Sequence, residues 1–185
     1  MNLGVNMGLF NLKKKSVRDR FKEKTIYSIG TFTGDLGRGL FAGFIGTAAM
    51  SFSQMLEMKI TKRKGNDTPL QAVGKVLGIP VLDLMPVMKL LLKEKLVNII
   101  HYAYGTAWGG VRGVIGATGL KGPLADAIHF SSVLGTELVM LPKLHLAPPV
   151  KKWDAQSISV SGVHHIVYAL VSGVVFDLLK SGRKR

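Results

Sequence analysis

Residues 101–116 read HYAYGTAWGGVRGVIG, an apolar stretch in which glycine recurs at Gly105, Gly109 and Gly113. An interior glycine costs a soluble helix about 1 kcal/mol relative to alanine, so this density is unfavourable in water. In a lipid bilayer the same spacing forms a smooth ridge that lets a neighbouring helix backbone approach closely. The stretch therefore predicts a membrane-spanning helix that packs against another helix through its three glycines.

Four stretches of the chain, this one included, are long and apolar enough for a transmembrane helix, which needs about 20 residues. They cover about residues 36–58, 96–118, 124–141 and 158–179. The connection over residues 59–94 contains Pro80 and Pro86, which interrupt its apolar patch, so we expect interfacial helices there. The sequence thus predicts an all-α, integral membrane four-helix bundle made of two transmembrane hairpins, occupying residues 35–180.

Basic residues are concentrated beside these apolar stretches. The chain has 25 Lys and Arg against 11 Asp and Glu, a formal net charge of +14, with dense basic runs within residues 13–24, 59–64 and 183–185. Anionic lipid headgroups attract charge that flanks a span, and no nucleic-acid-binding motif accompanies it. We therefore expect a lipid bilayer that includes anionic lipids as a partner, and no nucleic acid.

Both ends of the chain are polar and basic. Residues 1–34 are predicted to form a basic, partly amphipathic arm, either lying on the membrane surface or solvated, and residues 181–185 a basic tail. An even number of spans places the two termini on one side of the membrane. The balance of Lys and Arg among the connections favours the cytoplasmic side.

A repeat relates the second predicted span to the fourth. Residues 101–109 read HYAYGTAWG and residues 165–173 read HIVYALVSG, with His first, Tyr three residues later and Gly eight residues later. A weaker match relates residues 45–47 to residues 134–136 in the first and third spans. The pattern predicts a duplicated helical hairpin with a pseudo-twofold axis along the membrane normal. Chance similarity between glycine-rich apolar helices is the alternative.

Several longer stretches carry a resemblance. They read HYAYGTAWGGVRGVIG at 101–116, LKGPLADAIHFSSVLGTELVMLP at 120–142, LAPPVKKW at 146–153, HHIVYALVSGVVFDLL at 164–179 and SQMLEMKITKRKGNDTP at 53–69. Together with the HxxYGxxWG-type motif that begins at His101, they resemble a family of uncharacterised bacterial multi-pass membrane proteins with about four spans. The resemblance implies a multi-pass protein of the bacterial inner membrane, and it implies no activity.

Polar side chains inside the predicted spans form the first candidate site. Successive spans alternate in direction, and a helix rises 1.5 Å per residue, so these groups approach one membrane face at similar depth. The predicted layer comprises Gln54, His101, Tyr104, Glu137, His165 and Tyr168. It has three interpretations: hydrogen bonds that fix helix packing, a haem or divalent metal site formed by histidines from two helices, or a proton or solute path. The first requires no cofactor.

Arg112 and Asp126 form the second candidate site. They flank the turn predicted near Lys121, so both lie toward the same membrane face. A lone charge inside a membrane costs more than a pair. We therefore expect Arg112 and Asp126 to form an ion pair across the hairpin.

Motifs for catalysis are missing from the sequence. The chain has no cysteine, no nucleophile elbow, no P-loop and no strand-flanked GxGxxG. His164 and His165 are adjacent and point about 100° apart on a helix, so they are poorly placed to bind one ion. We expect no enzyme, but a structural or accessory component of an assembly with other membrane protein subunits. The alternatives are a small carrier or channel and a haem- or metal-binding membrane protein.

Overall fold

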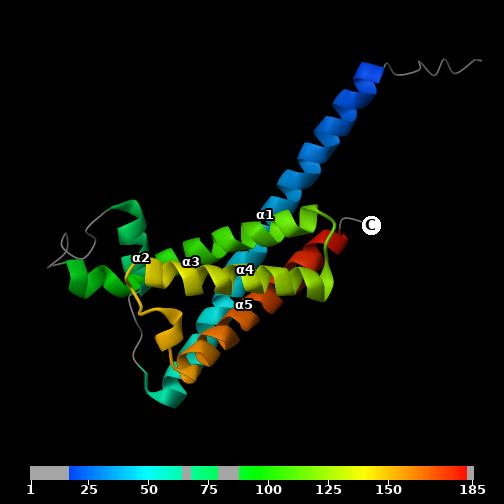
Figure 1. The fold of residues 1–185 in the computed structure, drawn as a ribbon. Helices are drawn as coiled ribbons and strands as arrows, with labels where there is room; N and C mark the ends of the chain where they lie inside the picture. Colours follow the sequence, from blue (N-terminus) through cyan, green and yellow to red (C-terminus); the bar gives the residue numbers. More distant parts are fainter. Residues whose placement is uncertain (1–16, 64–67, 79–87, 183–185) are drawn as a thin grey trace, which may run out of the picture.

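The computed structural model describes residues 17–63, 68–78 and 88–182, and Figure 1 shows that they are helical almost throughout. The helices are α1 (Val17–Thr61), α2 (Thr68–Leu77), α3 (Met88–Ala117), α4 (Gly122–Lys143) and α5 (Ala155–Ser181), with a short 3-10 helix, η1, at Val150–Lys152. These residues include no strand, which confirms the all-α prediction.

Three of these helices are long and apolar enough to cross a membrane, namely α1 over Arg20–Thr61, α4 and α5. They contain three of the four predicted spans. The remaining predicted span lies in α3, which has the length but not the mean hydropathy. Glycine, tyrosine, tryptophan and Arg112 take the place of aliphatic residues in its second half. The structure thus supports a membrane protein, and composition alone does not establish α3 as a span.

α1 and α3 run in opposite directions with their backbones in direct contact. Gly39 and Gly43 of α1 meet Gly109 and Gly113 of α3. A Cβ atom added to Gly43 would lie 2.5 Å from the Cα atom of Gly109, so nothing larger than a hydrogen atom fits there. Gly105 lies in the same interface. The glycine ridge predicted from the sequence is therefore the surface that α1 covers.

α5 packs on α1, and α4 packs mainly on α5. Ser53 meets His164 at one end of the α1–α5 contact and Asp35 meets Lys180 at the other, so these helices are antiparallel. The four long helices alternate in direction along the chain, and the first half of α1 projects beyond the end of the bundle where α5 finishes (Figure 1). A regular bundle of two hairpins is not established, because α1 contacts α3 and α5 far more than α3 contacts α4.

Two predicted boundaries differ from the structure. α1 is continuous from Val17 to Thr61, so the described part of the predicted arm, residues 17–34, belongs to the same helix as the first predicted span. Residues 25–34 contain no proline and no charge, and nothing in them ends a helix. α3 begins at Met88, inside the connection predicted over residues 59–94, where α2 forms a short helix. The other parts of the arm, connection and tail, residues 1–16, 64–67, 79–87 and 183–185, lie outside the described residues.

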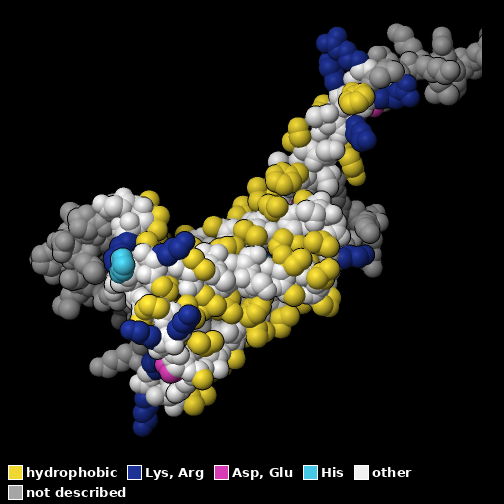
Figure 2. Space-filling view, viewed as in Figure 1, with side chains coloured by type: hydrophobic (Ala, Val, Ile, Leu, Met, Phe, Trp, Pro, Cys, Tyr) yellow, Lys and Arg dark blue, Asp and Glu magenta, His cyan; other side chains and the backbone are white. Residues whose placement is uncertain are grey.

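In the described residues, polar side chains occupy much of the interior and many large apolar side chains lie on the surface. Among the seven largest fully buried side chains all but Phe176 carry a polar group: Arg112, Tyr168, His129, Thr47, Asp35 and Ser172. Large apolar side chains such as Phe41, Ile99, Val139 and Leu170 are exposed. Figure 2 shows hydrophobic side chains across the middle of one face, with Lys and Arg toward its ends. A soluble protein has the opposite distribution, and this one suits helices surrounded by lipid.

The connection between α4 and α5 ends at the N-terminus of α5, which has a side-chain cap. Trp153 donates from Nε1 to the carbonyl oxygen of Pro148 at 2.7 Å. Asp154 caps α5 by accepting a hydrogen bond from the backbone N–H of Ser157 at 2.7 Å, and the Ser157 hydroxyl donates to the same carboxylate. These bonds stabilise the charged form and lower the pKa of Asp154 below its ordinary value.

Candidate functional site

Arg112 is completely buried where α3, α4 and α5 meet. Its Nε donates to Asp126 Oδ1 of α4 at 3.2 Å, and its Nη2 donates to Asp177 Oδ1 of α5 at 3.0 Å. The guanidinium carbon lies 4.6 Å from the centre of the Phe176 ring. Two carboxylates and an aromatic face are the partners that a buried cation requires. Arg112 therefore connects three helices.

Further charges extend this cluster to α1. Lys180 Nζ donates to Asp35 Oδ2 at 2.8 Å and to the carbonyl oxygen of Gly116 at 2.6 Å, and Arg38 donates to Asp35 at 3.0 Å. The six residues, which we call the charge network, form two sets of ion pairs, each with a cation near the Phe176 ring: Arg112 with Asp126 and Asp177, and Asp35 with Arg38 and Lys180. Three positive and three negative groups make it formally neutral. It links all four long helices at the end of the bundle where α5 finishes.

The sequence analysis missed four members of this network, namely Asp35, Arg38, Asp177 and Lys180, and of these Asp177 contacts Arg112 directly. The sequence predicts the Arg112–Asp126 pair, and the structure brings those two residues together. Asp177 adds a second carboxylate to Arg112, and its Oδ2 accepts the backbone N–H of Gly122 at 3.2 Å. The sequence does contain an indication of this role. Asp177 is an acidic residue in the last turn of an otherwise apolar span, and an acidic residue in that position requires a partner.

Histidine and carboxylate side chains meet at the opposite end of the bundle. His165 Nδ1 of α5 lies 3.5 Å from Glu137 Oε2 of α4, and Ser161 Oγ donates to the same oxygen at 2.7 Å. His101 of α3 is near enough to His165 for their charges to interact. Two members of the predicted layer, Glu137 of α4 and His165 of α5, are therefore in contact.

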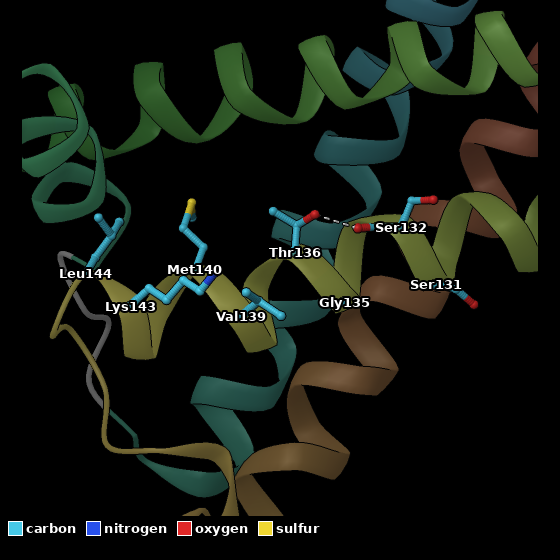
Figure 3. Close-up of a pocket in the computed structure, with 8 residues that line it drawn as sticks. All are labelled: Ser131, Ser132, Gly135, Thr136, Val139, Met140, Lys143 and Leu144. Carbon is cyan, nitrogen blue, oxygen red and sulfur yellow. Dashed lines mark hydrogen bonds between the residues drawn. The ribbon is translucent and has the colours of Figure 1, made fainter.

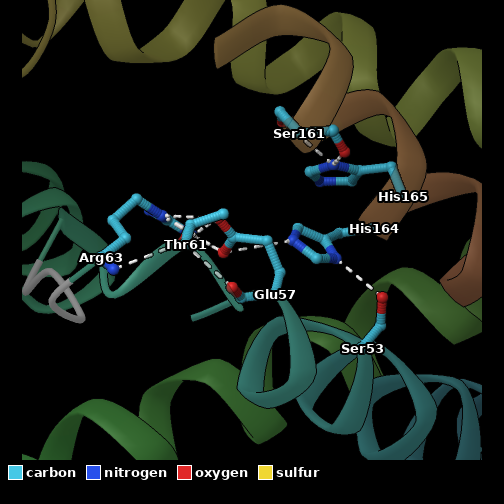
Figure 4. Close-up of polar contacts among 7 residues, drawn as sticks. All are labelled: Ser53, Glu57, Thr61, Arg63, Ser161, His164 and His165. Carbon is cyan, nitrogen blue, oxygen red and sulfur yellow. Dashed lines mark hydrogen bonds and ion pairs between the residues drawn. The ribbon is translucent and has the colours of Figure 1, made fainter. Parts of the chain in front are cut away.

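His164 faces α1 rather than α4 (Figure 4). Its Nδ1 lies 2.9 Å from Ser53 Oγ, and its Nε2 lies 4.0 Å from Glu57 Oε2. Arg63 holds Glu57 in place by donating from Nη2 at 2.8 Å. Because adjacent residues point in different directions on a helix, α5 presents one histidine to α1 and the next, His165, to α4. The sequence analysis did not predict this contact. The feature that could have indicated it is Glu57, an acidic residue near the end of the first predicted span.

The other members of the predicted layer lie elsewhere. The Tyr168 hydroxyl donates to the carbonyl oxygen of Gly105 at 2.6 Å, one turn deeper than the histidines. Tyr104 is exposed and packs edge-on against Trp108, with ring centres 6.2 Å apart. Gln54 is half-buried and makes no side-chain hydrogen bond to the described histidines or carboxylates. Equal depth did not bring these residues together, because the rotation of each helix decides which side chains face inward.

His129 and Tyr168 occupy the level between the charge network and the histidine end. Their ring centres are 5.4 Å apart and both side chains are almost fully buried. His129 Nε2 lies 3.0 Å from the carbonyl oxygen of Trp108 in α3. The sequence places His129 in a span without giving it a role. The feature that could have pointed to His129 is its position three residues after Asp126, which places both on the same face of the helix.

The predicted repeat has a partial counterpart in the packing. Gly109 and Gly173 are equivalent in the repeat, and each packs closely against the preceding predicted span, α1 and α4 respectively. In the same alignment Glu137, whose carboxylate meets His165, corresponds to Ala48. The histidine of α3 therefore has no acid at the equivalent position, and the two halves are not chemically identical.

A shallow hollow lies on the outer face of α4 (Figure 3). Its volume is about 550 Å³, and it is lined by Ser131, Ser132, Gly135, Thr136, Val139, Met140, Lys143 and Leu144. Neither the charge network nor the histidines line it. The hollow is open at the surface of the protein, so in a membrane it would face lipid.

The described residues contain no group of three His, Asp or Glu side chains close enough to hold a metal ion. A comparison of the chain with protein-family models, curated proteins and solved structures finds no match. The family resemblance of the sequence therefore stays a prediction. The geometry defines the class: an all-helical protein with three candidate membrane spans and a partly buried network of charges.

Proposed function

We propose that the chain is a four-span protein of a bacterial inner membrane and serves as a structural or accessory component of a larger membrane assembly. The charge network supports this role. Its two sets of ion pairs connect α3 to α4 and α5, and α1 to α5, through six groups whose formal charges sum to zero. A carrier that alternates between two open states moves one group of helices against another. A neutral network across all four helices favours fixed positions instead.

α3 is the fourth span in this proposal. Its backbone lies against that of α1 along the ridge from Gly105 to Gly113, so it follows α1 through the same layer. Its one charged residue at this depth, Arg112, has two carboxylate partners and is screened from lipid by complete burial. A span of modest hydropathy is stable when its polar groups face the bundle.

Cysteine labelling tests the four-span arrangement. The chain has no natural cysteine, and Val76 and Lys121 are exposed on either side of α3. If α3 crosses the membrane, an impermeant thiol reagent applied to intact cells should label Val76→Cys and leave Lys121→Cys unlabelled. Lys151→Cys, after α4, is the control and should behave as Val76→Cys does. Equal labelling of Val76→Cys and Lys121→Cys would contradict a four-span topology.

Copurification tests the accessory role. A tagged full-length chain, extracted in mild detergent, should migrate in a native gel with at least one other membrane protein in fixed stoichiometry. A photo-crosslinking residue at the outward-facing positions Ser131 of α4 and Leu170 of α5 should identify the face that meets this partner. Deletion of the chain should lower the amount of the partner in the membrane. A protein that purifies alone and crosslinks only to lipid would refute the proposal.

A further inference from the structure

The hollow on the outer face of α4 covers one half of that helix (Figure 3). Its lining residues lie between Ser131 and Leu144. α4 itself runs from Gly122 to Lys143, so the hollow begins near the middle of the helix and continues to its end. At 1.5 Å per residue, this part of the helix is about 20 Å long. One leaflet of a bilayer with its headgroups is also about 20 Å thick, so the hollow has the depth of a single lipid molecule.

Small side chains form the hollow, and two of its three hydroxyl groups bond to α4 itself. Gly135 has no side chain, and a Cβ atom built there would meet no other atom within 4 Å. The Ser132 hydroxyl donates to the carbonyl oxygen of Ile128 at 2.8 Å, and the Thr136 hydroxyl donates to that of Ser132 at 2.8 Å. Val139, near the next turn, adds an apolar side chain. Hydroxyl groups that bond to their own helix offer little to a polar solute, so this surface suits a hydrocarbon chain.

Lysine side chains lie at the outer end of the hollow. Lys143 lines it, and Lys75 of α2 donates from Nζ to the carbonyl oxygen of Leu144, another lining residue. Both lysines are exposed. An ammonium group carries three N–H donors, so this bond leaves Lys75 able to bind a further group. Residues 143–154 contain three lysines and one acidic residue, Asp154, which caps α5. The outer end therefore carries positive charge at the level of the lipid headgroups.

The position of Lys143 distinguishes a lipid from a second copy of the chain as the occupant. Two copies with the same membrane topology that met symmetrically through this hollow would bring Lys143 of one copy near Lys143 of the other. Such a contact is repulsive, because the charges are alike. An anionic phospholipid instead places a phosphate beside the two lysines and an acyl chain in the apolar part of the hollow. Charge and shape thus agree with this lipid at both ends of the site.

We propose that the hollow on α4 binds one anionic phospholipid, with its phosphate beside Lys143 and Lys75 and one acyl chain extending along the helix past Gly135 to Ser131. This site goes beyond the accessory role and requires only that α4 span the membrane, for which α4 is long and apolar enough. A lipid held there covers the outer face of α4. A partner protein then meets the exposed face of α5, where Leu170 lies.

Native mass spectrometry tests the site. The purified full-length protein in detergent is mixed with equal amounts of phosphatidylglycerol and phosphatidylcholine that carry the same acyl chains. The wild type should retain one phosphatidylglycerol per chain, in about tenfold excess over phosphatidylcholine. Gly135→Leu, which fills the hollow, should lower this retention several-fold. Lys143→Gln, which removes one charge beside the phosphate, should lower it about fivefold.

Matched controls separate the site from general effects of the substitutions. Gly162 of α5 also has no atom within 4 Å of an added Cβ atom, and it lies outside the hollow. Gly162→Leu should therefore retain lipid as the wild type does. Lys59→Gln removes an exposed lysine of α1 that does not line the hollow, and it should also match the wild type. Circular dichroism checks folding, and because Lys143 is exposed, Lys143→Gln tests the site even if Gly135→Leu fails to fold.

Four results would overturn the proposal. They are equal retention of the two lipids, unchanged retention in a folded Gly135→Leu or in Lys143→Gln, a dimer that Gly135→Leu dissociates, and capture of a partner protein from a photo-crosslinking residue at Ser131. The dimer would show that a second copy occupies the hollow. Lipid retention is measured on the isolated chain, so its failure leaves the accessory role, which copurification tests, standing.

Discussion

Replacement of Arg112 by leucine should destabilise the folded protein by about 3–5 kcal/mol, the usual cost of breaking a buried ion pair from one side. The change leaves Asp126 and Asp177 without their shared cation and removes the link between α3, α4 and α5. Unfolding by a denaturing detergent, followed by tryptophan fluorescence in mixed micelles, measures the loss. Arg112→Lys should recover little of it, because a single ammonium group does not reproduce the fork that reaches two carboxylates.

Two controls make this expectation specific. The triple variant Arg112→Leu, Asp126→Asn, Asp177→Asn removes all three charges and should be more stable than Arg112→Leu alone. Arg63→Leu breaks a more exposed pair with Glu57 and should cost far less than Arg112→Leu. If the triple variant is no more stable than the single one, the burial of unpaired carboxylates is not the cause of the loss.

Replacement of Gly43 by alanine should cost about 3 kcal/mol, at the upper end of the range for overpacked sites. The added Cβ atom would lie 2.5 Å from Gly109 Cα and 2.7 Å from the carbonyl oxygen of Gly105. These are backbone atoms of α3, so no side-chain rotation relieves the clash and the two helices must separate. The midpoint of thermal unfolding in detergent should fall accordingly.

Gly135→Ala is the matched control for Gly43→Ala. Gly135 also lies within a long helix, but a Cβ atom there would meet no atom within 4 Å. Alanine is the better helix former, so this variant should be as stable as the wild type or slightly more stable. Equal losses in the two variants would show that helix propensity, rather than the α1–α3 contact, determines the effect.

Several features follow from the sequence by itself. The recurrence of glycine every four residues from Gly105 to Gly113 predicts a close helix–helix contact, because the periodicity of a helix places these residues on one face. The long apolar stretches predict α1, α4 and α5, because their length and composition depend only on consecutive residues. The proximity of Arg112 to Asp126 follows from a turn that brings neighbouring segments back on each other.

The tertiary structure alone decided which polar residues meet. Tyr104 and Tyr168 occupy equivalent positions in the predicted repeat, yet one is exposed and the other is buried against Gly105 and His129. The charge network acquires Asp177 for the same reason. Depth along a helix can be counted from the sequence, but inward orientation depends on how each helix is rotated and on which neighbour covers it. These depend on contacts between segments far apart in the chain, which local periodicity does not encode.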